Sequence, residues 1–172
     1  GKNSCKPGCA EHEGTGVTGS PATILDIGLS TGDGFMSALI EWNSVFYTEH
    51  QVIDQQHQQM IGLLNALHGC LENTGNSRDL SEQLEALCNF TMEHFATEEQ
   101  VMAKMGYPHL ERHKAQHELL AAKARELNQS CLNGQQPLCC DVTEQLREWM
   151  LDHFLGEDRE LGLFLQQKSR SS

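Results

Sequence analysis

The chain has 172 residues, with 24 acidic and 12 basic side chains and a formal net charge of -12. A length of this order fits one domain with an extension and is sufficient for a buried core. The acidic balance, without clustered Lys and Arg, argues against a nucleic-acid-binding protein and against contact with an anionic membrane surface. No apolar run approaches the roughly 20 residues that span a bilayer, so we expect no membrane contact by this chain.

The seven cysteines are an odd number, which argues against a complete disulfide framework. Free thiols in a reducing compartment are the simpler interpretation, and we therefore expect a cytoplasmic location. Cys5 and Cys9 lie close to His12 in the sequence, but their spacing matches no strong zinc pattern. Cys139 and Cys140 are interpreted as two thiols in a loop.

The first part of the chain differs in composition from the rest. Residues 1–37 hold eight of the fifteen glycines and two of the four prolines. Such a composition is typical of a linker or a loosely docked extension. The sequence therefore predicts an irregular, glycine-rich N-terminal extension over residues 1–40 and a helical domain over residues 41–168.

After this extension, apolar residues recur at steps of three and four, which is the spacing of amphipathic helices. The first helical run ends near Gly75, the second ends at Gly106, and the third begins near Pro108. A fourth run starts at Asp141, which with Glu144 three residues later resembles an N-terminal capping box. Short connections make successive helices antiparallel, so we expect an all-α fold, an up-down-up-down antiparallel four-helix bundle.

Each predicted helix carries histidine on its apolar face. One such histidine is most often a core residue, but five on four converging helices would be costly to bury without shared partners. A metal centre would provide those partners, and imidazole with carboxylate ligands suits transition metals, not calcium or magnesium. Two pairs on these faces are four residues apart, so each pair can bind one ion or span two. These pairs are His94 with Glu98 and His113 with His117.

The fourth helix places its candidate ligands at an unusual spacing. His153 and Asp158 are five residues apart, and five residues of regular α-helix turn about 140° past the starting direction. A π-type widening would bring both side chains to the bundle axis, and Gly156 would tolerate one. We therefore predict a local widening near Gly156. Glu157 is the competing carboxylate, at the standard four-residue step from His153.

Five segments of the chain resemble the successive signatures of the hemerythrins. They are EWN, VIDQQHQQM, HFATEEQVM, GYPHLERHKAQH and WMLDHFLGEDREL, within residues 41–165. The resemblance is strongest to bacterial hemerythrins and to hemerythrin-like domains of bacterial signalling proteins. It implies a non-haem di-iron centre with an oxo or hydroxo bridge, and it favours Asp158 over Glu157. The implied ligands are His113, His117 and His153 on one iron, His57 and His94 on the other, and Glu98 and Asp158 between them.

The function implied by this resemblance is reversible dioxygen binding. In the family, O2 enters the open position of the second iron and is reduced to a hydroperoxide while both irons become ferric; release reverses the step. Oxygen sensing, storage and carriage all fit, and a signalling domain on the same parent chain would be a further partner. The alternatives are a di-iron peroxidase, oxidase or nitric oxide reductase, and an iron-buffering protein. No acid–base pair stands out beyond the ligands, so we expect no enzyme, with at most weak peroxidase-type activity.

The resemblance also implies an apolar O2 pocket beside the irons. Its expected lining residues are Met150, Trp149, Phe95 and Phe154. Met150 stands where the family commonly has an aliphatic residue, and its thioether is flexible and oxidisable. Glu99 is interpreted as a solvated charge or one that supports a ligand. The remaining histidines are interpreted as surface residues: His12, His50, His68 and His109.

Overall fold

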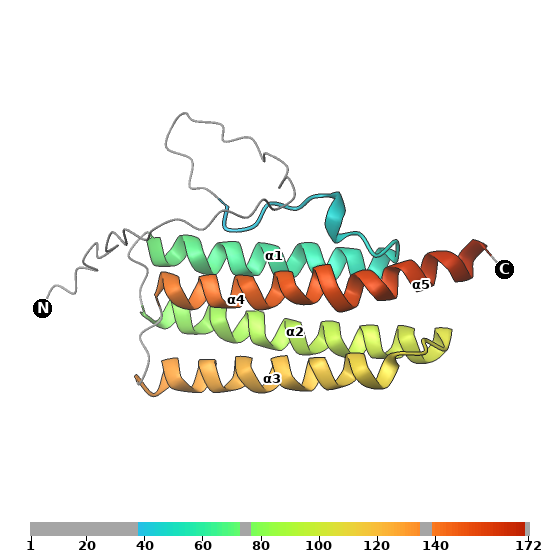
Figure 1. Ribbon diagram of the computed structural model, residues 1–172. Helices are drawn as coiled ribbons and strands as arrows, with labels where there is room; N and C mark the ends of the chain where they lie inside the picture. Colours follow the sequence, from blue (N-terminus) through green and yellow to red (C-terminus); the bar gives the residue numbers. More distant parts are fainter. Residues whose placement is uncertain (1–37, 73–76, 135–138, 171–172) are drawn as a thin grey trace, which may run out of the picture. The chain divides into compact units, whose positions relative to one another are not determined.

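The computed structural model describes residues 38–72, 77–134 and 139–170. A 3₁₀ turn η1 (Ser44–Phe46) precedes four helical rods, which are α1 (Gln51–Glu72), α2 (Ser77–Met105), α3 (Leu110–Leu132) and a composite of α4 (Cys140–His153), the π-helical segment η2 (Phe154–Asp158) and α5 (Arg159–Arg170). Successive rods run in opposite directions (Figure 1), and α1 packs against both α2 and α4 while α2 packs against α3. The predicted antiparallel four-helix bundle is therefore confirmed.

The residues just before the bundle form hydrogen bonds with its helices. The amide of Ile40 donates to Asn65 Oδ1 at 3.0 Å, and the Asn65 side chain donates back to the Ile40 carbonyl at 2.8 Å. Arg147 Nε donates to the carbonyl of Leu39 at 3.1 Å. Residues 39 and 40 are thus held against α1 and α4. Most of the predicted extension lies outside the described residues, so the domain boundary stays a prediction.

The end of α2 has the form that its sequence predicts. Gly106 adopts a positive φ of 68°, which residues other than glycine rarely adopt. The amide of Tyr107 then donates to the carbonyl of Met102 at 2.9 Å, the long hydrogen bond of a Schellman-type cap. The helix therefore stops at Gly106, and the chain turns directly into α3.

The capping box predicted at Asp141 is wrong. Helix α4 begins one residue earlier, at Cys140, and its N-cap is Cys139, whose side chain makes no capping hydrogen bond. The Cys139 carbonyl accepts the amide of Val142 at 3.0 Å. Asp141 lies in the first turn instead, where a carboxylate is favoured by the helix dipole. The cysteines of the described ranges form no disulfide, while Cys5 and Cys9 lie outside those ranges.

Buried apolar side chains form two groups along the bundle. The larger group includes Leu64, Leu84 and Val142, and the smaller one includes Met102 and Leu161. In every rod the histidines and carboxylates singled out by the sequence fall between these two groups. The bundle therefore surrounds a polar centre with an apolar layer on each side, which keeps bulk water away from it.

Helix α5 approaches the chain at Thr48 so closely that only glycine fits. A Cβ added at Gly162 would lie 2.8 Å from Thr48 Cα. Thr48 cannot yield easily, because its amide and hydroxyl donate to Asp54 Oδ1 at 2.7 and 2.8 Å. We expect Gly162→Ala to lower the free energy of unfolding by about 1–3 kcal/mol. Gly62→Ala, in α1 with no atom within 4 Å of the added Cβ, should raise it by about 0.5–1 kcal/mol.

Urea denaturation of both glycine variants measures these two effects on the same scale. The comparison is internally controlled, since both changes add one methyl group to a helical glycine. Shifts of the same sign in the two variants would contradict the close approach of α5 to Thr48.

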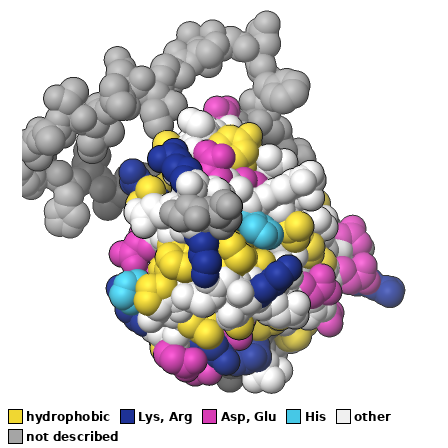
Figure 2. Space-filling model, turned by 90° about the vertical axis from the view of Figure 1, so that its right-hand side faces the viewer, with side chains coloured by type: hydrophobic (Ala, Val, Ile, Leu, Met, Phe, Trp, Pro, Cys, Tyr) yellow, Lys and Arg dark blue, Asp and Glu magenta, His cyan; other side chains and the backbone are white. Residues whose placement is uncertain are grey.

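The surface agrees with the acidic composition. Among the described residues, no helix combines the length and the apolar character needed to cross a bilayer. On the face drawn in Figure 2, Lys and Arg side chains lie among Asp and Glu and do not form a continuous basic stripe. Such a stripe is what phosphate contacts require. The absence of a nucleic-acid partner and the cytoplasmic location both stay predictions.

Candidate metal centre

The seven residues predicted as ligands converge at the centre of the bundle. Each is at most 5% exposed although all seven carry polar or ionisable groups. All four rods contribute: His57 from α1, His94 and Glu98 from α2, His113 and His117 from α3, and His153 with Asp158 from α4 and η2. The sequence therefore anticipated the set of residues that the fold brings together.

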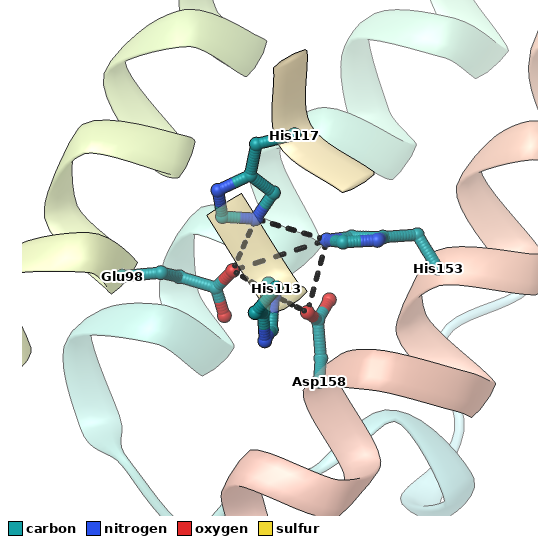
Figure 3. Close-up of side chains that lie close together, drawn as sticks. All are labelled: Glu98, His113, His117, His153 and Asp158. Carbon is teal, nitrogen blue, oxygen red and sulfur yellow. Dashed lines mark hydrogen bonds and ion pairs between the residues drawn. The ribbon is translucent and has the colours of Figure 1, made fainter. Parts of the chain in front are cut away.

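These residues form two overlapping groups of potential metal ligands. In each group, one ligand atom from every residue lies within 4.8 Å of the others. Both groups contain Glu98 and Asp158, so the two carboxylates are shared by two sets of imidazoles. Figure 3 shows the larger group, with His113, His117 and His153 around the two carboxylates. One group adds His113, His117 and His153, and the other adds His57 and His94.

The two oxygens of Asp158 face different groups. Its Oδ1 lies 3.1 Å from the Nε2 atoms of both His113 and His153, while its Oδ2 lies 3.2 Å from His57 Nε2. Glu98 is less symmetric, because its Oε2 lies 3.2 Å from His117 Nε2 and 3.6 Å from His94 Nε2. Carboxylates placed in this way can each contact two cations.

The π-helical segment explains how Asp158 reaches the centre. Segment η2 covers Phe154–Asp158 and contains Gly156, so the predicted widening is confirmed. The extra residue lets Asp158 point inward from the same rod as His153. Glu157 does not join the imidazoles, and its Oε2 forms an ion pair with Arg112 Nη2 at 3.0 Å. The structure thus places Asp158, and not Glu157, beside the imidazoles.

The chemistry of this centre fits cations. The inner Nε2 atoms of His57, His94 and His113 have no hydrogen-bond partner, nor do the oxygens of Glu98 and Asp158. The short distances between these atoms lack hydrogen-bond geometry. Burying so many unsatisfied polar atoms is costly. Nitrogen lone pairs and carboxylate oxygens that converge on one small volume are satisfied together by metal ions.

The protonation of the metal-free centre differs from one imidazole to another. Burial alone would lower the pKa of His113, but the contacts with Asp158 and Glu98 outweigh it and raise the pKa to about 9. Burial dominates at His94 and lowers its pKa to about 4. Burial and Asp158 would raise the pKa of Glu98, yet the surrounding imidazoles lower it to about 2. At neutral pH the carboxylates are therefore ionised, and His113 carries a proton.

Metal uptake should therefore release a proton. Because the pKa of His113 is raised to about 9, protons compete with a metal below that pH and cease to compete above it. We expect Zn2+ affinity to rise between pH 7 and 9 by about tenfold per pH unit for each displaced proton. The free energy of unfolding of the metal-free protein has the opposite pH dependence. The stabilisation that protonated His113 provides is lost as the pH rises through the same range. Titration against a chelator of known pH dependence measures the first effect, and a flat profile would contradict it.

An apolar cavity adjoins this centre. It has a volume of about 50 Å³ and is lined by all four residues predicted for an O2 pocket, with His153 in its wall. Phe154 stacks on the His57 ring at 3.9 Å, and Phe95 stacks on the His117 ring at 3.9 Å. The four predicted lining residues are Met150, Trp149, Phe95 and Phe154.

Three groups that support the imidazoles lie around the centre. The Nδ1 atoms of His57, His94 and His117 face the Phe46 carbonyl, Gln56 Oε1 and Glu99 Oε1, respectively. Sequence reasoning missed the first two. No sequence pattern indicates which backbone carbonyl will accept a hydrogen bond from a histidine. Gln56 could not be assigned either, because the histidine that it contacts, His94, lies on another helix. Glu99 was interpreted only as a solvated or supporting charge, and the structure shows it in contact with His117.

The histidines outside the centre differ in how far they are exposed to solvent. His109 is exposed, as predicted, at the start of α3. His50 and His68 are half-buried, and His68 Nδ1 lies 2.8 Å from the Thr143 hydroxyl, so their interpretation as plain surface residues is wrong. His12 lies outside the described residues.

Comparisons with known proteins agree with this geometry. A family model described as the Hemerythrin HHE cation binding domain matches residues 48–164, which include all seven converging residues. The bacteriohemerythrin of Methylococcus capsulatus is 32% identical over 126 residues, covering 73% of this chain and 95% of that protein. The myohemerythrin of Riftia pachyptila is 27% identical over 117 residues, covering 68% of this chain and 86% of that protein.

Solved structures give the same result. A crystal structure of wild-type hemerythrin is 31% identical in sequence and matches with a TM-score of 0.70, covering 74% of this chain and 98% of the solved one. The similarity therefore extends from sequence to the arrangement of the helices. By its family match, its relatives and its fold, the chain belongs to the hemerythrin family.

Proposed function

We propose that this protein binds dioxygen reversibly at a non-haem di-iron centre. The observation that carries the proposal is the pair of overlapping ligand groups that share Glu98 and Asp158. The names of the relatives, bacteriohemerythrin and myohemerythrin, support it. When bound, two irons would supply the electrons that O2 takes up and recover them on release. The proposed ligands are His57, His94, Glu98, His113, His117, His153 and Asp158.

The two ligand groups differ in how many protein atoms they offer. One group has three imidazoles and both carboxylates, whereas the other has two imidazoles and the same carboxylates. The group with fewer ligands leaves coordination capacity for a small molecule. Phe154 stacks on His57 of this group and also lines the apolar cavity. O2 is small and apolar, so a cavity of this kind favours it over water.

The cavity gives a prediction that leaves the proposed ligands untouched. Ala124 is buried in its wall on α3, and Ala124→Leu would fill part of the space. We expect the O2 association rate to fall by about tenfold while the metal content stays unchanged, with a stability cost of about 1–3 kcal/mol from overpacking. Ala122→Leu, at an exposed position of the same helix, is the control. Flash or stopped-flow mixing with O2 measures the rate, and an unchanged rate would mean that O2 does not use this cavity.

The deciding experiment combines metal analysis with absorption spectroscopy. The reduced protein is loaded with iron without oxygen, exposed to O2, and then deoxygenated. Two irons per chain and a visible band that forms with O2 and disappears on its removal would establish the proposal. Two irons without a reversible band would favour the enzymatic or iron-buffering alternatives. Zinc, or no metal, would reject the proposal while leaving the fold intact.

The role of O2 binding in the cell is a separate question. Sensing, storage and carriage all use the same reversible step, and a signalling domain on the parent chain stays a prediction. A sensor should change a partner surface or the N-terminal extension between its oxygenated and deoxygenated forms. Limited proteolysis of the two forms tests this, because a carrier should give identical cleavage patterns.

A further inference from the structure

The three supported imidazoles are held by acceptors of different charge. His57 Nδ1 lies 3.5 Å from the Phe46 carbonyl, and His94 Nδ1 lies 3.3 Å from Gln56 Oε1. His117 Nδ1 lies 3.2 Å from Glu99 Oε1. The first two acceptors are neutral dipoles, and Glu99 is the one carboxylate among the three. The two ligand groups therefore receive unequal electrostatic support.

The direction of these hydrogen bonds is fixed by chemistry. Carbonyl, amide and carboxylate oxygens can only accept, so each Nδ1 donates its proton and each Nε2 keeps its lone pair. The amide of Gln56 is oriented because its Nε2 donates to the Thr97 hydroxyl at 3.1 Å, and Thr97 donates to the Glu93 carbonyl at 2.9 Å. His94 thus faces an oriented amide oxygen, while His117 faces a charge.

The His117 ring is also fixed in orientation. Phe95 stacks on it at 3.9 Å with an interplanar angle of 11°. The ring nitrogen Nε2 then points to Glu98 Oε2 at 3.2 Å, and Nδ1 points to Glu99. Glu98 and Glu99 are neighbours in α2, so consecutive carboxylates contact opposite nitrogens of one imidazole.

Lys114 contacts the same supporting carboxylate. Its Nζ lies 3.6 Å from Glu99 Oε2, while Oε1 of Glu99 faces His117. The Glu99 side chain is 29% exposed and that of Lys114 is 41% exposed, so solvent screens the pair in part. The positive charge of Lys114 pulls electron density from the carboxylate that supports His117. Lys114 therefore opposes the effect of Glu99.

We propose that Glu99 is a positioning residue that makes His117 a stronger electron donor to its metal, and that Lys114 moderates this effect. The inference rests on the proposed function, which makes His117 a ligand. A carboxylate that accepts the outer proton of a ligating imidazole fixes its tautomer and raises its basicity. A more basic ligand stabilises the oxidised metal. The group containing His117 is thereby favoured for oxidation over the group containing His94, which has a neutral acceptor.

Two substitutions of opposite charge test this inference. Glu99→Gln keeps an acceptor oxygen but removes the negative charge, and Lys114→Met removes the positive charge while keeping the apolar stem. In a mediated redox titration, Glu99→Gln should shift the ferric-to-ferrous ratio at a fixed potential toward ferrous by about tenfold. Lys114→Met should shift it in the opposite direction by a smaller factor. Glu118→Gln, at an exposed position next to His117, controls for the change in net charge and should have little effect.

A second measurement separates positioning from charge. In the zinc-loaded protein, which is diamagnetic, nitrogen-15 NMR reports the proton on His117 Nδ1. We expect Glu99→Gln to keep that proton in a hydrogen bond and Glu99→Ala to lose it. Zinc affinity should fall by about tenfold in Glu99→Ala. Since this measurement does not involve O2, it is independent of oxygen-binding activity.

The outcomes distinguish this inference from the proposed function. Opposite redox shifts in the two variants support the inference. Equal shifts in Glu99→Gln and Glu118→Gln, shifts of one sign in both Glu99→Gln and Lys114→Met, or no shift at all overturn it, even when the unmutated protein holds two irons and binds O2 reversibly. Failure of the unmutated protein to hold two metals would instead overturn the proposed function, and the inference with it.

Discussion

Asp158→Asn should abolish binding of a pair of metal ions. Asp158 is fully buried, and its two oxygens face imidazoles of both ligand groups at 3.1 and 3.2 Å. Asparagine has almost the same shape, but it replaces one carboxylate oxygen with an amide nitrogen that cannot bind a metal. We expect the affinity for the second metal to fall by about 100-fold or more, beyond the range typical of residues that only support a ligand. Metal analysis after gel filtration should then find one metal per chain, or none.

The neighbouring residue supplies a matched control. Glu157→Gln makes the same chemical change one position earlier, at a side chain that pairs with Arg112. We expect it to keep two metals per chain and to change stability by less than about 1 kcal/mol, as is usual for exposed ion pairs. If Glu157→Gln lost metal and Asp158→Asn did not, the π-helical segment would present the other carboxylate, and the proposed ligand set would be wrong.

Removal of the metals should strongly destabilise the bundle. Without cations, the inner atoms of the centre remain buried and unsatisfied. Metals that bind only the folded chain stabilise it by about 4 kcal/mol when the free metal is about 1,000 times its dissociation constant. For a chain of this size that corresponds to a fall in Tm of about 8–16 °C on metal removal. Calorimetry of the iron-loaded protein before and after dialysis against a chelator measures the difference.

The asparagine variant provides the control for this second prediction. Asp158→Asn should respond weakly to the chelator, because it has less metal to lose. An equal fall in Tm for the variant and the unmutated protein would show that the chelator acts elsewhere. An unchanged Tm in the unmutated protein would mean that the centre contributes little to folding, against the cost of its unpaired buried atoms.

Much of the fold and the ligand set could be predicted from the sequence because both depend on periodicity. The apolar spacing gave the rods, and Gly106 marked the end of α2 through its positive φ. Histidines that recur on the apolar faces of several helices converge once those helices pack, so the spacing indicated the five histidines and Glu98. The choice of Asp158 over Glu157 came from the resemblance to the hemerythrins. The spacing of His153 and Asp158 even indicated the π-helical segment, since a regular helix would have separated them.

What escaped prediction depends on contacts that periodicity does not encode. The support of His57 comes from a backbone carbonyl at Phe46, in a turn before α1. Gln56 lies beside His57 in the sequence but faces His94 on another helix. The start of α4 was misplaced because aspartate is a residue type favoured at helix N-caps, which pointed to Asp141. In the structure the N-cap is Cys139, and its backbone carbonyl accepts a hydrogen bond from the amide of Val142. These features require the relative rotation of the helices, which a single sequence does not specify.

The π-helical segment has a consequence for how such a helix can arise by mutation. Segment η2 holds one more residue than a regular α-helix would need over Phe154–Asp158. Each side chain of α5 therefore points in the direction that a regular helix would give to the residue one position before it. Leu161 and Leu165 follow Asp158 in that phase and remain in the core. Deleting one codon in this segment would restore a regular helix with His153 and the aspartate four residues apart. A single in-frame insertion or deletion therefore connects two versions of this rod, and neither version has to remove a ligand or turn an apolar face to solvent.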